Sequence, residues 1–119
     1  MTVLTSLESP DLNDIGFAEA NVEETVLRLA KLAGASGLDG VVASPHEIKM
    51  IREHLGTGFL IVTPGIRPAG TQTDDQKRTM SAAQALQCGA DFIVVGRSII
   101  TAPDPGEAAR LMLEEANQR

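Results

Sequence analysis

The sequence predicts an α/β fold of about four strand–helix units with parallel strands. Short apolar runs that do not alternate with polar residues are typical of strands buried on both faces, and they stand at 1–6, 41–43, 59–63 and 92–95. Apolar residues at helical spacing follow the runs. Polar residues separate each run from the helix that follows it. Such alternation implies a parallel sheet with right-handed crossovers.

The length of the chain favours half of a (β/α)8 barrel over an open doubly wound sheet. A complete barrel needs roughly 250 residues, and this chain has 119. The apolar runs and the helices are short, and polar residues follow each run. We therefore predict a single half-barrel domain over 1–119. In this architecture the loops that follow the strands build the site.

The first third of the chain predicts a strand, a polar connection and a helix. Residues 1–6 are β-branched and apolar, and then polar, so we expect the strand there. The polar and acidic stretch 7–20 predicts a loop above that strand. Asn21 and Glu24 have the spacing of a capping box, which predicts a helix start, and Gly34 predicts its end.

The middle of the chain predicts two further strand–helix units. The run at 41–43 leads to Ser44-Pro45-His46-Glu47, in which a capping Ser is followed by Pro at the first helical position. Gly56 ends that helix. The strand at 59–63 is followed by a polar stretch at 64–79, which we expect to be an exposed loop.

The last third predicts a helix, the fourth strand and a final helix. Ser81 and Gln84 form another capping box, and Gly89 ends the helix. The strand at 92–95 follows. Asp104 begins the last helix, and we expect three apolar side chains to face inward from it: Ala108, Leu111 and Met112.

Composition excludes several classes of function. A net charge of −6 argues against sequence-independent nucleic-acid binding, which needs clustered Lys and Arg. No apolar run approaches 18 residues, so we expect no membrane span. The single Cys88 excludes an intramolecular disulfide and favours the reducing cytoplasm. His46 and His54 lack partners at metal-ligand spacing, so we predict surface histidines and no metal site.

The turn after the last strand carries the signal for an anion site. Gly96 has no Cβ, which allows a ligand to approach the backbone. The planar guanidinium of Arg97 can bind a phosphate through two hydrogen bonds. Backbone N–H groups at the start of the next turn favour anions as well. A Gly-Arg pair is also common in ordinary turns, so the pair alone is weak evidence.

Five motifs in order resemble the second half of orotidine 5′-phosphate decarboxylase of the bacterial type. They are VLTS at 3–6, GLDGVVAS at 37–44, VTPGIRP at 62–68, DQ at 75–76 and VGR at 95–97. The resemblance covers essentially the whole chain. It implies a (β/α)8 barrel enzyme of pyrimidine biosynthesis that converts orotidine monophosphate to uridine monophosphate and CO2 without a cofactor.

The resemblance also implies the residues that bind the nucleotide. Thr5 would contact the nucleotide, with Ser6 and Ser9 as less certain neighbours. Arg67 and Gln76 match the loop that closes over the phosphate, and Gly96 with Arg97 match the floor beneath it. Guanidinium, amide and backbone N–H donors suit a phosphate dianion. Other readings stay open for two of them: Arg67 as part of a salt bridge at the loop edge, and Gln76 as a solvated loop residue.

The catalytic array of the family has no counterpart in this sequence. The resemblance places an Asp/Lys/Asp/Lys array mostly in the other half of the barrel. Lys31 and Lys49 fall within predicted helices, and Lys77 lies in a loop. A carbanion-like transition state needs a positioned ammonium. We therefore predict no catalytic residue here and an inactive isolated chain.

Three alternatives follow from the half barrel. The chain is an inactive phosphate-binding fragment, or it is active with a separate N-terminal half, or it is another barrel relative such as a hexulose-phosphate synthase or a non-catalytic structural half barrel. The PGIRP segment at 64–68 speaks against that synthase. Open strand edges drive association. We therefore expect a homodimer or a higher oligomer as partner, besides the phosphate of orotidine or uridine monophosphate.

Overall fold

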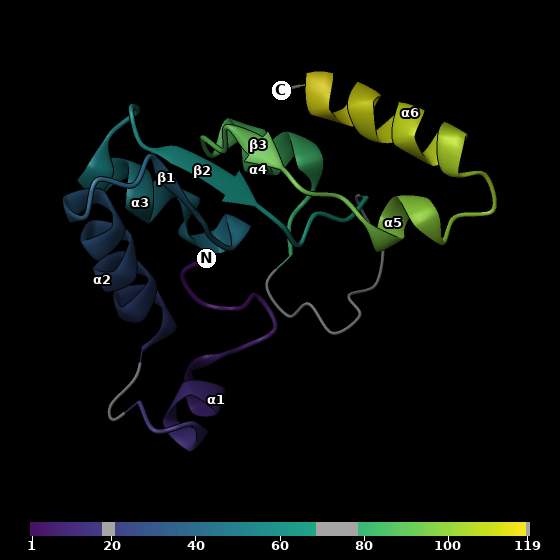
Figure 1. Ribbon diagram of the computed structural model, residues 1–119. Helices are drawn as coiled ribbons and strands as arrows, with labels where there is room; N and C mark the ends of the chain where they lie inside the picture. Colours follow the sequence, from purple (N-terminus) through teal and green to yellow (C-terminus); the bar gives the residue numbers. More distant parts are fainter. Residues whose placement is uncertain (18–20, 69–78, 119) are drawn as a thin grey trace.

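The computed structural model describes residues 1–17, 21–68 and 79–118 (Figure 1). One parallel sheet has the order β1-β2-β3, with β1 (Gly40–Val42), β2 (Leu60–Thr63) and β3 (Phe92–Ile93). The helices are α1 (Ser9–Asp14), α2 (Val22–Ala35), α3 (Ile48–Leu55), α4 (Ala82–Gln87), α5 (Arg97–Ile100) and α6 (Pro105–Asn117), and a 3-10 helix, η1 (Pro45–Glu47), precedes α3. The predicted α/β class and parallel pairing are confirmed.

The predicted strand at 1–6 is wrong, so the described sheet has three strands and not four. The segment does begin beside β1, because the Thr2 backbone N–H donates to the Val42 carbonyl at 3.0 Å. The Leu7 N–H then donates to the Leu4 carbonyl at 3.0 Å. That turn ends the segment before a ladder of hydrogen bonds with β1 can form.

The predicted loop at 7–20 contains a short helix, α1, within its described part. Pro10 lies in the first turn, where its missing N–H costs nothing. The Asp11 carboxylate accepts a hydrogen bond from the Glu8 backbone N–H at 2.7 Å. The polar composition of this stretch therefore belongs to a capped helix as much as to a loop.

Side-chain caps confirm the predicted starts of three helices. Asn21 accepts from the Glu24 N–H at the start of α2, Ser81 accepts from the Gln84 N–H at α4, and Asp104 accepts from the Glu107 N–H at α6. α2 ends one residue beyond its predicted end at Gly34. The helix runs through Gly34 to Ala35, and Gly37, with φ of 82°, provides the left-handed turn.

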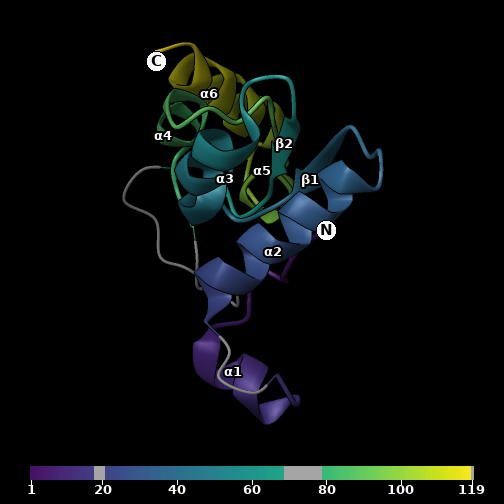
Figure 2. The same cartoon turned by 90° about the vertical axis from the view of Figure 1, so that its left-hand side faces the viewer.

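The two faces of the sheet have different environments. Val41 and Ile61 point to the side covered by helices and are buried in the core. Their strand neighbours Leu60 and Phe92 point the other way and are exposed. Figure 2 shows the strands on one side and α3 and α4 on the other, so Figure 1 looks onto the open face of the sheet. The described residues thus form a sheet with helices on one face.

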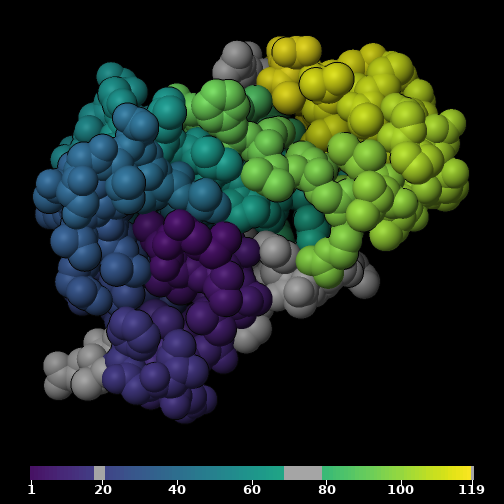
Figure 3. All heavy atoms as spheres, in the orientation of Figure 1, coloured from purple at the N-terminus to yellow at the C-terminus, as the bar shows by residue number. Residues whose placement is uncertain are grey.

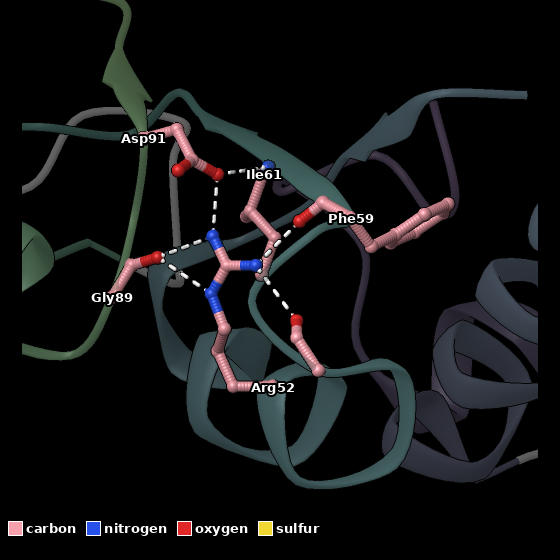
Figure 4. A network of polar contacts seen from close by, with 6 residues as sticks. Arg52, Phe59, Ile61, Gly89 and Asp91 are labelled. Atoms are coloured by element: carbon pink, nitrogen blue, oxygen red, sulfur yellow. Dashed lines mark hydrogen bonds and ion pairs between the residues drawn. The ribbon is translucent and has the colours of Figure 1, made fainter.

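Arg52 hydrogen-bonds to the chain at the ends of the strands opposite the site (Figure 4). The guanidinium of Arg52 donates to the carbonyls of Gly56, Phe59 and Gly89 and pairs with the Asp91 carboxylate. Asp91 also accepts from the Ile61 backbone N–H at 2.8 Å. One side chain therefore links the end of α3, the start of β2 and the approach to β3.

In the final helix, α6, one side chain that was predicted to face inward is exposed. Met112 of α6 is buried as expected and Ala108 is half-buried, but Leu111 is exposed. α6 packs mainly against α4 and α5, and its buried stripe is narrower than the sequence predicts. Of the described helices, none is long and apolar enough to cross a membrane.

Candidate functional site

The candidate site lies at the edge where the three parallel strands end. Ser44 follows β1, Pro64 and Gly65 follow β2, and Gly96 follows β3. Parallel strands deliver these residues to one edge, which is where ligands bind in such sheets. The structure thus brings three short polar or glycine-containing turns to one rim.

Two arginine-bearing turns are joined at this rim. The Val94 N–H donates to the Thr63 carbonyl at 2.8 Å, which carries the pairing of β2 and β3 past the strand ends. Beyond that point, the Ser98 hydroxyl donates to the Ile66 carbonyl at 3.4 Å. Ile66 precedes Arg67, and Ser98 follows Arg97. The two arginines therefore lie on adjacent, hydrogen-bonded turns.

The turn that carries Arg67 is firmly held. Gly65 has φ of 76°, a conformation that favours glycine, and Ile66 is fully buried. The Arg67 N–H donates to the Met80 carbonyl at 3.1 Å, and the Met80 N–H donates to the Gly65 carbonyl at 3.2 Å. The Arg67 guanidinium also donates to the Ile66 carbonyl at 2.9 Å. These backbone hydrogen bonds fix the position of the Arg67 backbone, from which its side chain extends.

The turn that carries Arg97 is open to solvent. Gly96 precedes α5, and a Cβ added to it would meet nothing within 4 Å. Packing within the chain therefore does not require glycine here, and the space above its Cα is available to a ligand. Gly96 and Arg97 are both exposed, and the Thr101 hydroxyl donates to the Arg97 carbonyl at 2.6 Å, which holds the short helix.

The other predicted site residues that the structure describes are not on these two turns. Thr5 is buried, in the segment that lies beside β1, so β1 and β2 separate it from the turn of Arg97. The Ser9 hydroxyl accepts from the Val22 N–H at 3.2 Å and thus helps to position α2. Ser6 is half-buried. Gln76 lies outside the described residues.

Sequence reasoning missed two residues near the rim. Ser98 joins the two arginine turns, and its place directly after Gly96 and Arg97 was the available signal. His46, predicted to be a surface residue, is exposed but its Nε2–H donates to the Thr79 carbonyl at 2.9 Å. It therefore connects η1 to the chain just before Met80. His54 is exposed as predicted.

A neighbouring cavity has the wrong charge for a phosphate. It measures about 260 Å³ and is lined by Glu8, Glu23 and Glu47, with His46 beside them. Three carboxylates would repel a dianion. No group of His, Cys, Asp or Glu among the described residues could hold a metal ion. The arginine turns are thus the better anion site on this rim.

Comparison with known proteins matches the chain to one family. Residues 1–112 match the family described as "Orotidine 5'-phosphate decarboxylase / HUMPS family". The chain is 53% identical over 115 residues to the orotidine 5'-phosphate decarboxylase of Geobacter sulfurreducens, covering 97% of this chain and 48% of that protein. The corresponding protein of Gluconobacter oxydans is 55% identical over 115 residues, with the same shares covered.

Solved structures agree with this match. The crystal structure of orotidine 5'-phosphate decarboxylase from Lactobacillus acidophilus has a TM-score of 0.79 and 40% identity, covering 98% of this chain and 47% of that one. The enzyme from Pyrococcus horikoshii OT3 has a TM-score of 0.63 and 32% identity, with 88% and 46% covered. The chain thus spans about half the length of these relatives. It belongs to the orotidine 5'-phosphate decarboxylase / HUMPS family.

Proposed function

We propose that the chain is the phosphate-binding, C-terminal half of a bacterial-type orotidine 5'-phosphate decarboxylase, built as half of a (β/α)8 barrel over 1–119. The observation that carries this proposal is the Ser98–Ile66 hydrogen bond, which places Arg67 and Arg97 on adjacent turns at the strand ends. The family match supports the same assignment. The ligand is the phosphate of orotidine or uridine monophosphate.

Each residue proposed to bind the phosphate supplies a hydrogen-bond donor that suits a dianion. Arg67 and Arg97 offer guanidinium groups from two adjacent turns, and the backbone at Gly96 is open to approach. Gln76 would add an amide and Thr5 a contact to the nucleotide. A charge-assisted hydrogen bond contributes roughly 1.5–3 kcal/mol, so two or three can hold the ligand.

The isolated chain should not decarboxylate. Stabilising a carbanion-like transition state requires an ammonium at the reacting carbon. Lys31 and Lys49 lie exposed on α2 and α3, and Lys77 lies outside the described residues. We propose that the chain binds the nucleotide in the cytoplasm without a cofactor and carries no catalytic residue.

A second candidate function is catalysis together with a complementary half. The observation that favours it is the coverage of only 48% of the length of a relative that is 53% identical. The missing length would supply the charged array that this chain lacks. A non-catalytic structural half barrel is the third reading, and it predicts no nucleotide binding at all.

Calorimetric titration of the purified chain with uridine monophosphate tests the binding proposal. Replacing Arg97 by Ala should weaken binding roughly 10–100-fold, because about 1.5–3 kcal/mol of charge-assisted hydrogen bonding is lost. Arg28→Ala is the matched control, since Arg28 is exposed on α2, away from the rim. Equal affinities for the Arg97 and Arg28 variants would contradict the proposal.

A decarboxylation assay separates the first two readings. The purified chain should consume no orotidine monophosphate. Addition of the N-terminal half of a relative should restore turnover if the second reading holds. Turnover by the chain alone would overturn the claim that it lacks the catalytic groups.

A further inference from the structure

His46 connects the end of β1 to the turn that carries Arg67. Its Nε2–H donates to the Thr79 carbonyl at 2.9 Å, across 33 residues of sequence. The next residue, Met80, is bonded to the Arg67 turn in both directions. The Arg67 N–H donates to the Met80 carbonyl, and the Met80 N–H donates to the Gly65 carbonyl. The imidazole therefore holds the segment that in turn holds Arg67.

The backbone of His46 is firmly placed, although its side chain is exposed. The Ser44 hydroxyl accepts from the His46 N–H at 3.3 Å, and the Ser44 carbonyl accepts from the Glu47 N–H at 3.1 Å. Ser44, Pro45 and Glu47 are all buried, so the residues on both sides of His46 are packed into the protein. The imidazole thus extends from a fixed point just after β1.

The same series of contacts reaches the turn that carries Arg97. The Ser98 hydroxyl donates to the Ile66 carbonyl at 3.4 Å, and Ile66 is fully buried. Figure 3 shows atoms of α5, which begins at Arg97, at the surface of the molecule. Hydrogen bonds therefore link the turns that follow the strands, and His46 provides a link from β1.

An ordered backbone at Arg67 favours the binding of an anion. A long side chain loses rotamer freedom when it binds, and affinity improves when the backbone that carries it is already ordered. The two backbone hydrogen bonds of Met80 supply that order, and the imidazole holds the residue before Met80. An imidazole can donate from Nε2 both when neutral and when protonated, so the bond requires no charge.

We propose that His46 is a positioning residue for the anion site. It holds the Arg67 turn in the geometry that binds a phosphate, and it does so without touching the ligand. The inference rests on the proposed function, because the ligand it concerns is the phosphate of a pyrimidine nucleotide. Since His46 acts through Arg67, the effect of removing the imidazole should disappear when Arg67 is absent.

Calorimetric titration with uridine monophosphate tests this role. His46→Ala should weaken binding roughly 3–10-fold, the scale of one neutral hydrogen bond. His46→Gln keeps an N–H donor at similar reach and should bind within about twofold of the parent chain. His54→Ala is the matched control and should bind like the parent, because His54 is exposed and its Nδ1–H donates within α3 to the Met50 carbonyl.

A double-mutant cycle separates positioning from direct contact with the ligand. In an Arg67→Ala background, His46→Ala should cause no further loss of affinity. An equal loss in both backgrounds overturns the route through Arg67. Lys49 is exposed and lines a cavity together with His46 and Thr79, so Lys49→Ala tests whether positive charge near the imidazole is what matters. This variant should bind like the parent, and a loss equal to that of His46→Ala overturns the role of the hydrogen bond.

Amide hydrogen exchange measured by NMR gives a readout that needs no nucleotide. The Met80 and Arg67 N–H groups should exchange faster in His46→Ala than in the parent chain, because local opening of the turn becomes easier. The Val94 N–H, which donates to the Thr63 carbonyl at 2.8 Å, is the internal reference and should not change. Unchanged exchange at Met80, or equal acceleration at Val94, overturns a local role for His46.

The binding outcomes distinguish this inference from the proposed function. A parent chain that does not bind uridine monophosphate overturns the proposed function, and the positioning role with it. A parent chain that binds and is weakened by Arg97→Ala, while His46→Ala binds as tightly as the parent, overturns the role of His46 alone. A His46→Gln variant as weak as His46→Ala overturns the hydrogen bond as the means of positioning.

Discussion

At the scale of single residues, the side chain that most clearly holds this fold together is Arg52. Its side chain is 15% exposed and its guanidinium reaches three carbonyls and one carboxylate. Few other groups could serve them all, because only a guanidinium offers five donors in a planar fork. The site depends on it indirectly, since the strands it aligns end at the arginine turns.

Replacing Arg52 by Lys should therefore destabilise the chain. The ammonium keeps the charge but cannot reach all acceptors, so acceptors that include the carbonyl of the buried Phe59 lose their donors. We expect the free energy of unfolding to fall by roughly 2–4 kcal/mol in urea denaturation. The control is Arg28→Lys on the exposed face of α2, with a change within about 0.5 kcal/mol. Equal effects at both positions would refute this role for Arg52.

At the scale of elements, the contact between β1 and β2 depends on a glycine. A Cβ added to Gly40 would overlap the carbonyl of Leu60, its partner in the sheet. Backbone atoms cannot move aside as a flexible side chain can. The strands approach closely because residue 40 has no side chain.

Gly40→Ala should thus push the two strands apart. We expect a loss of about 1–3 kcal/mol of unfolding free energy, as in other overpacked sites. Gly58→Ala is the matched control, because a Cβ there meets nothing within 4 Å and the residue needs no left-handed backbone. That control should be neutral or slightly stabilising. A destabilised Gly58 variant beside an unaffected Gly40 variant would show the opposite of this account.

The charges on α6 give a second prediction at this scale. Arg110 hydrogen-bonds Glu107 and pairs with Glu114, and the bond to Arg110 lowers the pKa of Glu107 below 4.5. The carboxylate thus supports the helix above its unfolded pKa, and that support is lost as the pH falls through the folded value. Arg110→Ala should return the pKa of Glu107 toward 4.5 in an NMR titration. Glu114→Gln should leave it depressed, and equal shifts in the two variants would contradict this assignment.

At the scale of the whole molecule, features set by neighbouring residues could be predicted from the sequence, and features set by contacts distant in the sequence could not. The caps at Asn21, Ser81 and Asp104 depend on residues three apart, so the sequence alone identifies them. The strand expected at 1–6 fails because a strand needs sustained partners, and Leu7 turns the segment away after Thr2. Leu111 was predicted to face inward from the apolar spacing along the helix. It is exposed, because that spacing does not show which apolar side chains another element covers.

The same division holds for the candidate site. The order of apolar runs and polar turns was enough to predict that Gly96 and Arg97 follow the last strand. The pairing of the two arginine turns could not, because the Ser98–Ile66 contact spans 32 residues and depends on how β2 and β3 align. The position of Thr5 relative to Arg97 depends on the curvature of the sheet, which sequence spacing does not encode.

We propose that this rim binds a nucleotide through its phosphate. The most direct test is calorimetric titration of the purified chain with uridine monophosphate and, in parallel, with uridine. We expect saturable binding of the monophosphate and at least about tenfold weaker binding of the nucleoside, since one charge-assisted hydrogen bond contributes about 1.5 kcal/mol or more. Equal affinity for both ligands, or no binding of the monophosphate, would contradict it.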